Sequence, residues 1–156
     1  MQANELSNLK QQIISSLISQ LEEKKKTHFS HQKDLQDALQ SEQKSTAGDK
    51  HDTNRAMIHL EQEKLQHQYQ LLQHQIQNLV NIKGMQVSTN SVEFGSLVKT
   101  SNSIFFIGVG LGKQFFEGIT IYCIGVDSPI GQTLIHKKKG DEFIFNGQKE
   151  EVLQIG

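Results

Sequence analysis

The feature that most constrains the fold is a long N-terminal stretch without helix breakers. From Asn4 to about Gln43 the sequence contains no Pro or Gly, and most of its residues are good helix formers. The apolar residues of this stretch recur at steps of three and four, which predicts an amphipathic helix. The residues that form the stripe are Leu6, Leu9, Ile13, Leu17 and Leu21.

A second stretch, from Thr53 to about Val80, repeats this behaviour. Its apolar residues recur every seven positions, at Ile58, Leu65, Leu72 and Leu79. Heptad stretches on both sides of a short turn predict two antiparallel helices that pack on one another as a coiled-coil hairpin.

The segment AGDKHDTN, residues 47–54, separates the two stretches and carries two acids, Asp49 and Asp52. Turn and cap formers are concentrated at residues 45–53, which we predict to be the tip of the hairpin. Asp52 or Thr53 is the expected N-cap of the second helix. From the pattern alone, capping and interaction with the positive end of the helix dipole explain both acids.

Six of the seven histidines also lie in this half of the chain. His28 and His31 are three residues apart, but a zinc site needs three or four ligands, and no other residue beside them has suitable spacing. We therefore interpret these histidines as part of a solvated, polar helix face.

The C-terminal half has a different periodicity after a linker at residues 81–92. Its β-branched and aromatic segments, separated by Gly or Asn, predict strands. The predicted strands are Ser96–Thr100, Ser103–Gly110, Gly118–Val126, Asp141–Asn146 and Glu150–Ile155. Asn146-Gly147 predicts a two-residue hairpin turn between the last two strands.

One short helix is expected between the third and fourth predicted strands. Ser128 is its predicted N-cap and Pro129 its first residue. The three lysines of HKKKG, residues 136–140, are expected at its C-terminal end, with Gly140 as the stop. The segment GVGLGK, residues 108–113, lacks the first Gly and the final Ser or Thr of a phosphate-binding loop, and predicts a flexible hairpin connection.

These elements predict an α+β protein. Residues 1–80 form an antiparallel two-helix coiled-coil hairpin, and residues 93–156 form a small, mostly antiparallel sheet with one short helix. The acids and bases balance in each half, with nine basic and ten acidic side chains in residues 1–80 and seven of each in residues 81–156. Without a basic excess, independent binding to DNA or RNA is disfavoured.

The single cysteine, Cys123, cannot form an intrachain disulfide, which fits a reducing compartment. The N-terminus lacks the pattern of a signal peptide. No apolar run approaches the ~20 residues that span a bilayer. We therefore expect a soluble cytoplasmic protein that does not bind membranes.

Three segments together resemble the Gre-type (GreA/GreB-like) bacterial transcript cleavage factors. DSPIGQTLIHKKKGDEF, residues 127–143, is similar to the C-terminal signature of that family. VEFGSLVKT, residues 92–100, resembles the start of the same domain, and GDKHDTNRA, residues 48–56, resembles the tip loop. The order of the segments matches the family over essentially the whole chain, which implies that residues 93–156 form an FKBP-like domain.

The resemblance implies a transcription elongation factor that binds bacterial RNA polymerase. In this family the C-terminal domain docks at the rim of the polymerase secondary channel, and the hairpin enters the channel. The tip acids then help to hold a second Mg²⁺ next to the RNA 3′ end, and the polymerase itself cleaves backtracked RNA. By position, Asp49 and Asp52 match the tip acids and metal ligands, whereas Asp127, Ser128 and Pro129 match the polymerase-facing segment.

The tip departs from the family in two ways. Asp52 stands where the family has Glu, and Thr53-Asn54-Arg55-Ala56 replaces Asn-Ala-Glu-Tyr. A second hypothesis is therefore a regulator that binds the secondary channel without stimulating cleavage. A third is a prolyl isomerase, suggested by the FKBP-like sheet, although fold alone does not carry activity and no aromatic-lined pocket is evident from the sequence. The oligomeric state stays open.

Overall fold

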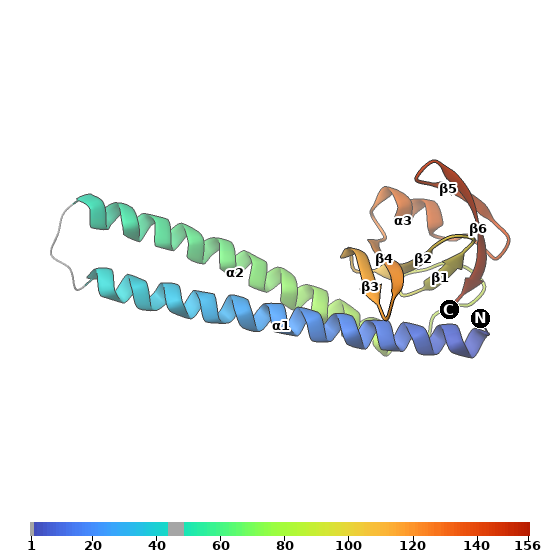
Figure 1. The fold of residues 1–156 in the computed structure, drawn as a ribbon, viewed down its shortest axis with the longest axis horizontal. Helices are drawn as coiled ribbons and strands as arrows, with labels where there is room; N and C mark the ends of the chain where they lie inside the picture. Colours follow the sequence, from blue (N-terminus) through green and yellow to red (C-terminus); the bar gives the residue numbers. More distant parts are fainter. Residues whose placement is uncertain (1, 44–48) are drawn as a thin grey trace. The chain divides into compact units, whose positions relative to one another are not determined.

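The computed structural model describes residues 2–43 and 49–156 and contains two long helices, a six-stranded sheet and a short third helix (Figure 1). Helix α1 spans Ala3–Gln43 and helix α2 spans Asp49–Lys83. Residues from the two helices pair in antiparallel order, and a small sheet domain follows. The predicted fold class, an α+β protein with an N-terminal helical hairpin, is confirmed.

Helix α2 begins earlier than the sequence predicts. It starts at Asp49, so Asp52 and Thr53 lie inside the helix, and the prediction that one of them is the N-cap is wrong. An Asp in the first turn is favourable because the helix dipole is positive there. Gly48 is the last helix breaker before this point, and nothing in the residues that follow it opposes a helix.

The chain divides into two compact units. The hairpin unit is residues 19–77, and the sheet unit is residues 1–18 together with 78–156. The sequence-based division placed residues 1–80 in a single hairpin domain. In the structure, the start of α1 (up to residue 18) and the end of α2 (from residue 78) group with the sheet.

The sheet has the strand order β3-β4-β2-β1-β6-β5. Neighbouring strands are antiparallel, except that β2 and β4 are parallel. The strands are β1 (Leu97–Thr100), β2 (Ile104–Gly108), β3 (Gly112–Phe116), β4 (Ile119–Gly125), β5 (Glu142–Phe145) and β6 (Gln148–Ile155).

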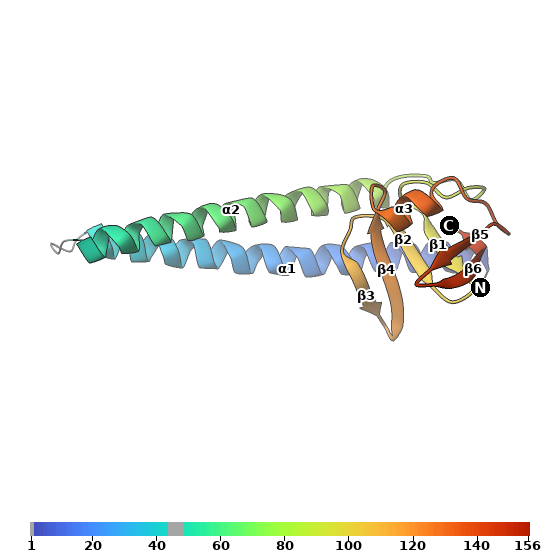
Figure 2. The same cartoon turned by 90° about the horizontal axis from the view of Figure 1, so that it is seen from above.

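Strand β3 was not predicted, and the expectation of a flexible hairpin connection at residues 108–113 is wrong. Gly112 and Lys113 already belong to β3, and β4 lies between β2 and β3 in the sheet. The apolar strand β4 takes the inner position, and the more polar β3 takes the edge. Figure 2 shows the β3–β4 hairpin extending from the rest of the sheet.

The sheet is covered on both faces. Phe105 and Ile107 of β2 belong to a core cluster with Leu134, whereas Phe106, between them, points to the opposite face. A Cβ atom added at Gly108 would lie 2.7 Å from Cδ1 of Ile82 in α2 and 3.3 Å from Phe106, so the end of α2 packs on this second face. The double burial explains why β2 reads as a continuous apolar run.

The short helix α3 spans Pro129–Leu134 and begins as predicted. Its end differs from the prediction, because the helix stops at Leu134, before the lysines, and Ile135 is the C-cap. The helix does not continue because the backbone of residues 136 and 137 is hydrogen-bonded to Val92 instead. The Asn146-Gly147 turn is confirmed, with positive φ angles of 51° and 76°.

In the hairpin unit, polar pairs join α1 to α2. Gln32 donates a hydrogen bond to Gln66 (3.1 Å), and Gln62 of α2 donates one to Gln36 of α1 (3.1 Å). Among the described side chains of this unit, the buried apolar residues are Leu21, Leu39, Leu65, Leu72 and Ile76. The two helices are therefore held by leucine contacts interrupted by glutamine pairs.

Lys10 in α1 is a buried cation in the sheet unit, with a side chain only 5% exposed. Burial lowers the pKa of Lys10, and the nearby Glu93 opposes this shift. Below the lowered pKa the folded protein carries the full cost of a buried ammonium group. As the pH rises from there toward 10.5, the folded state binds fewer protons than the unfolded state, so that stability rises.

Lys10→Met is therefore expected to stabilise the protein at neutral pH by about 1 kcal/mol. The advantage over the wild type should shrink as the pH approaches 10.5. Chemical denaturation followed by circular dichroism at several pH values measures both effects. A less stable variant at neutral pH would contradict the assignment of a net desolvation cost to Lys10.

Candidate functional site

The first candidate site is the pair of acids at the tip of the hairpin unit. Asp49 and Asp52 are three residues apart in the first turn of α2, a spacing that brings two helical positions to the same face. Asp52 is exposed, and the side chain of Asp49 lies outside the described residues. The predicted tip at 45–53 is only partly described, since residues 44–48 are outside the described ranges.

The position of these acids limits what they do alone. The N-terminal end of a helix carries a partial positive charge, which favours carboxylates but disfavours a bound cation. Two carboxylates supply only part of the six oxygen ligands that Mg²⁺ requires. A metal bound here would need ligands from outside the chain.

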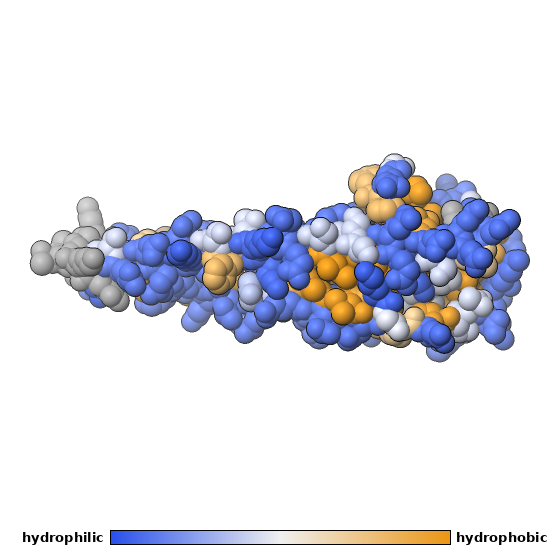
Figure 3. Space-filling model, turned by 90° about the horizontal axis from the view of Figure 1, so that it is seen from below, coloured by the Kyte–Doolittle hydropathy of each residue, from blue (hydrophilic) through white to orange (hydrophobic). Residues whose placement is uncertain are grey.

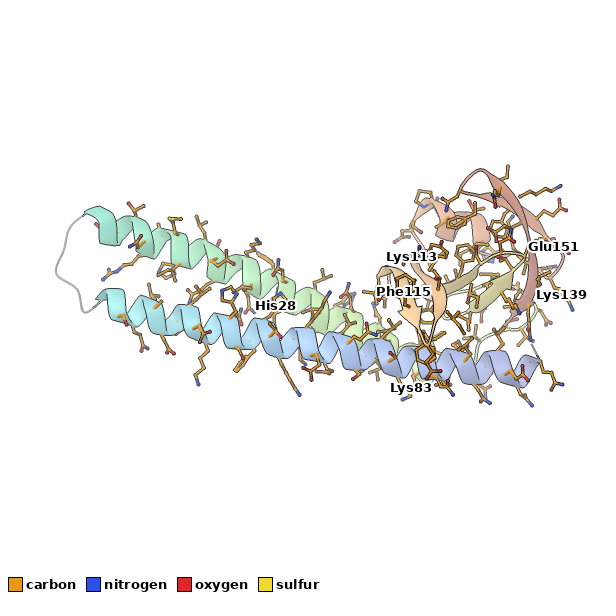
Figure 4. The ribbon with its side chains drawn as sticks, viewed as in Figure 1. His28, Lys83, Lys113, Phe115, Lys139 and Glu151 are labelled. Carbon is orange, nitrogen blue, oxygen red and sulfur yellow. The ribbon has the colours of Figure 1, made fainter. Side chains whose placement is uncertain are left out.

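His28 does not belong to the solvated face that the sequence predicted. It is half-buried, and its ring lies 2.8 Å from the Lys24 carbonyl oxygen through Nδ1 and 2.9 Å from Gln68 Oε1 through Nε2. Figure 4 shows the ring directed from α1 toward α2. His28 therefore joins the helices. Among the side chains that the structure describes, which leave out residues 42–51, no three His, Cys, Asp or Glu are grouped as metal ligands.

The second candidate site is the start of α3 in the sheet unit. Asp127 and Pro129 are exposed, whereas Ser128 is half-buried. The Ser128 hydroxyl donates a hydrogen bond to the Gly125 carbonyl (2.8 Å) and accepts one from the Gly131 N–H (3.1 Å). Ser128 is thus used by the fold as the N-cap, while its two neighbours present their side chains to solvent.

A shallow cavity of about 410 Å³ opens beside Asp127. Its lining combines apolar side chains with two acids and a histidine: Glu93, Phe94, Val126, Asp127, Gln132, Ile135 and His136. Phe94 is the one aromatic side chain in this lining. Such a concave apolar surface rimmed by carboxylates suits an apolar side chain next to a basic one on a partner protein.

Three other aromatic residues of the sheet unit pack against one another, away from this cavity lining. Phe105 contacts Tyr122 and Phe145, with ring centroids 5.6 Å and 5.0 Å apart, and Tyr122 contacts Phe145 at 5.1 Å. Phe105 is fully buried, so this cluster fills the core. The sequence identified these aromatic residues only as strand formers.

Cys123 of β4 is 1% exposed, and burial raises the pKa of its thiol to about 12. Because the reactive species is the thiolate, we expect no reaction with a disulfide reagent such as Ellman's reagent at mildly alkaline pH. Full reaction is expected only after unfolding in denaturant, which absorbance measures. Rapid labelling of the folded protein would show that the β4 region opens readily.

Figure 3 shows that the visible face of the hairpin unit is mostly hydrophilic. Among the described residues, no helix combines the length and apolar character needed to cross a membrane.

Comparisons with protein-family models, with curated proteins and with solved structures found no match to the chain.

Proposed function

We propose that this protein is a Gre-like transcription elongation factor that binds RNA polymerase through its secondary channel. The observation that carries the proposal is the combination of a long two-helix hairpin with acids at its tip and a small sheet domain whose α3 begins at the expected Ser128-Pro129. Each part matches a segment of the sequence that resembles the family. The comparisons with known proteins neither add to this resemblance nor remove it.

In the proposed mechanism the protein supplies carboxylates, and the polymerase supplies the active site. Hydrolysis of a phosphodiester with two metal ions needs one ion to activate water and another to stabilise the leaving oxygen. Asp49 and Asp52 would contribute oxygen ligands and negative charge to a Mg²⁺ ion shared with the polymerase. The isolated tip would not hold that ion, because the positive end of the helix dipole disfavours a bound cation.

Docking is assigned to the start of α3. Asp127 and Pro129 are exposed beside the 410 Å³ cavity, and Ser128 holds the local backbone in place. The proposed role of Ser128 is therefore to position its neighbours, and Asp127 is the residue that would contact a basic group on the polymerase.

A second candidate function is regulation of the polymerase without cleavage. The observation that favours it is the location of Asp52 inside α2, one methylene shorter than the Glu of the family. A side chain that is ~1.5 Å shorter at a metal site lowers the rate by on the order of 100-fold unless other groups compensate.

One experiment separates the two functions. The full-length protein is added to a backtracked elongation complex of bacterial RNA polymerase with Mg²⁺, and the length of the labelled RNA is followed with time. Shortening of the RNA supports the cleavage factor. Slowed elongation with RNA of unchanged length supports the regulator, and the absence of both effects, together with no binding to polymerase, contradicts both.

A further inference from the structure

A further cavity, which we call the Lys10 cavity, lies within the sheet unit and has a volume of about 350 Å³. Its lining comes from the start of α1, from the segment that follows α2 and from the end of β6. The proposed docking site at α3 shares no lining residue with it. The polar side chains of the lining are Ser7, Lys10, Gln11, Gln86 and Thr89.

Lys10 is the one charged side chain in this lining. It is 5% exposed, and its ammonium group forms no hydrogen bond or ion pair with the described residues. Among those residues, the one fully enclosed side-chain nitrogen or oxygen without a partner is Nε of Arg55. The Lys10 ammonium also lacks a partner, so it must reach solvent, and the cavity that its side chain lines provides that solvent.

The other polar side chains of the cavity are also free of partners. Ser7 and Thr89 carry hydroxyls, and Gln11 and Gln86 carry amides. None of these four side chains forms a hydrogen bond with another described residue. All four groups can donate a hydrogen bond, and none has a negative charge. The cavity therefore offers a ligand one cation and four neutral donors.

No acid of the structure neutralises Lys10 at close range among the described residues. Glu93 lies outside the lining, and its Oε1 accepts a hydrogen bond from the Ser88 N–H (2.8 Å). Gly156 lines the cavity, but its backbone N–H and carbonyl are hydrogen-bonded to Leu97 (2.8 Å and 2.7 Å). Burial lowers the pKa of Lys10 although Glu93 opposes the shift, as expected for an ammonium without a close anion.

We propose that the Lys10 cavity binds a small oxyanion, a phosphate or carboxylate group, through the Lys10 ammonium and the surrounding hydroxyls and amides. The oxygens of such a group accept hydrogen bonds, which matches a lining whose polar side chains can all donate them. The bound anion would offset the cost of the unpaired ammonium, which explains a lysine where an apolar side chain would be more stable. The proposal does not use the role in transcription.

The first test is isothermal titration calorimetry of the full chain with sodium phosphate and, separately, with sodium succinate, at an ionic strength held constant with sodium chloride. Saturable binding of at least one anion is expected, and the tighter of the two identifies the group that the site prefers. Lys10→Met should weaken binding by about 10- to 100-fold, the effect of losing a charge-assisted hydrogen bond.

The matched control is Lys139→Met, which removes the same charge from an exposed position of the sheet unit outside the cavity lining (Figure 4). Its affinity for the anion should equal that of the wild type. Ser7→Ala removes a neutral donor from the lining and should weaken binding by less than Lys10→Met does.

The second test uses stability. The midpoint of thermal unfolding of the wild type should rise with the concentration of the anion that binds, because the anion binds only the folded state. The midpoint of Lys10→Met, which is expected to fold and to be the more stable protein without the anion, should not rise beyond the change seen with sodium chloride.

Three results would overturn the proposal. The first is the absence of saturable binding by both phosphate and succinate. The second is equal affinity of the wild type and Lys10→Met. The third is a loss in Lys139→Met as large as that in Lys10→Met, which would show a general effect of protein charge instead of a site.

Discussion

Replacement of both tip acids, Asp49→Asn with Asp52→Asn, is expected to lower RNA cleavage in backtracked complexes by about 100-fold or more. Each substitution keeps the size of the side chain and removes one negative charge from the proposed Mg²⁺ site. Affinity for RNA polymerase should stay within a factor of about two, because the residues to which we assign docking, Asp127 and Pro129, are unchanged. The measurement is the rate of RNA shortening at saturating factor, with binding measured separately by competition.

The hairpin itself offers a matched control for this variant. Asp34 and Asp37 are exposed and have the same three-residue spacing as the tip acids, but they lie in α1, away from the first turn of α2. Asp34→Asn with Asp37→Asn removes the same charge and should leave cleavage unchanged. If the tip variant cleaves as fast as the wild type, the acids have no metal role, whereas equal losses in both variants would point to the total charge of the hairpin.

Asp52→Glu tests the length of the second acid. If the missing methylene limits metal binding, this variant should cleave faster than the wild type. A variant that cleaves more slowly would show that the shorter side chain is adapted to this tip.

Gly131→Ala is expected to destabilise the sheet unit by about 3 kcal/mol. A Cβ atom at this position would lie 2.1 Å from the Gly125 carbonyl oxygen and 2.9 Å from Ser128 Oγ. The closest of these atoms belongs to the backbone, so the clash is relieved only by moving α3 away from the end of β4. Denaturant unfolding followed by circular dichroism measures the loss of stability.

The same variant tests the docking proposal. Displacement of α3 would also displace Asp127 and Pro129, so polymerase affinity should fall under conditions where the protein is still folded. Gly110→Ala is the control, since its Cβ would lie 3.6 Å from the nearest atom, an ordinary contact. Equal stability of the two variants would show that the α3 backbone is more adaptable than the contact implies.

The sequence predicted the elements whose signals are local. The start of α3 follows from Ser128 and Pro129, and the β5–β6 turn follows from Asn146-Gly147, because capping and turn conformation depend on adjacent residues. The end of α3 was wrong because it depends on Val92, which is distant in sequence. Strand β3 was missed because GKQFF, residues 112–116, has neither alternation nor β-branched residues, and its place at the sheet edge depends on β4.

The burial of individual polar residues could not be predicted from the sequence either. Glu150 opens a predicted strand as an ordinary polar residue, yet it is 3% exposed and accepts hydrogen bonds from the Thr100 and Ser103 hydroxyls. These partners are about fifty residues away: Thr100 is the last residue of β1, and Ser103 lies in the turn between β1 and β2. His28 is a similar case, since only the antiparallel pairing of α1 with α2 brings Gln68 to it. For the candidate sites, the sequence selected positions, but exposure separates Asp127 and Pro129 from the internally bonded Ser128.

The glutamine pairs also fix the register of α1 against α2, and therefore the position of the tip. The step of four residues from Gln32 to Gln36 in α1 is matched by a step of four from Gln66 back to Gln62 in α2. Each helix therefore has the same number of residues between the two pairs. Asp49 is thirteen residues from Gln36 and thirteen from Gln62, which places it at the midpoint of the count. Removal of seven residues from each arm would keep the facing stripes in phase and shorten the hairpin by roughly 10 Å, whereas the loss of seven from one arm would move the midpoint off the acid.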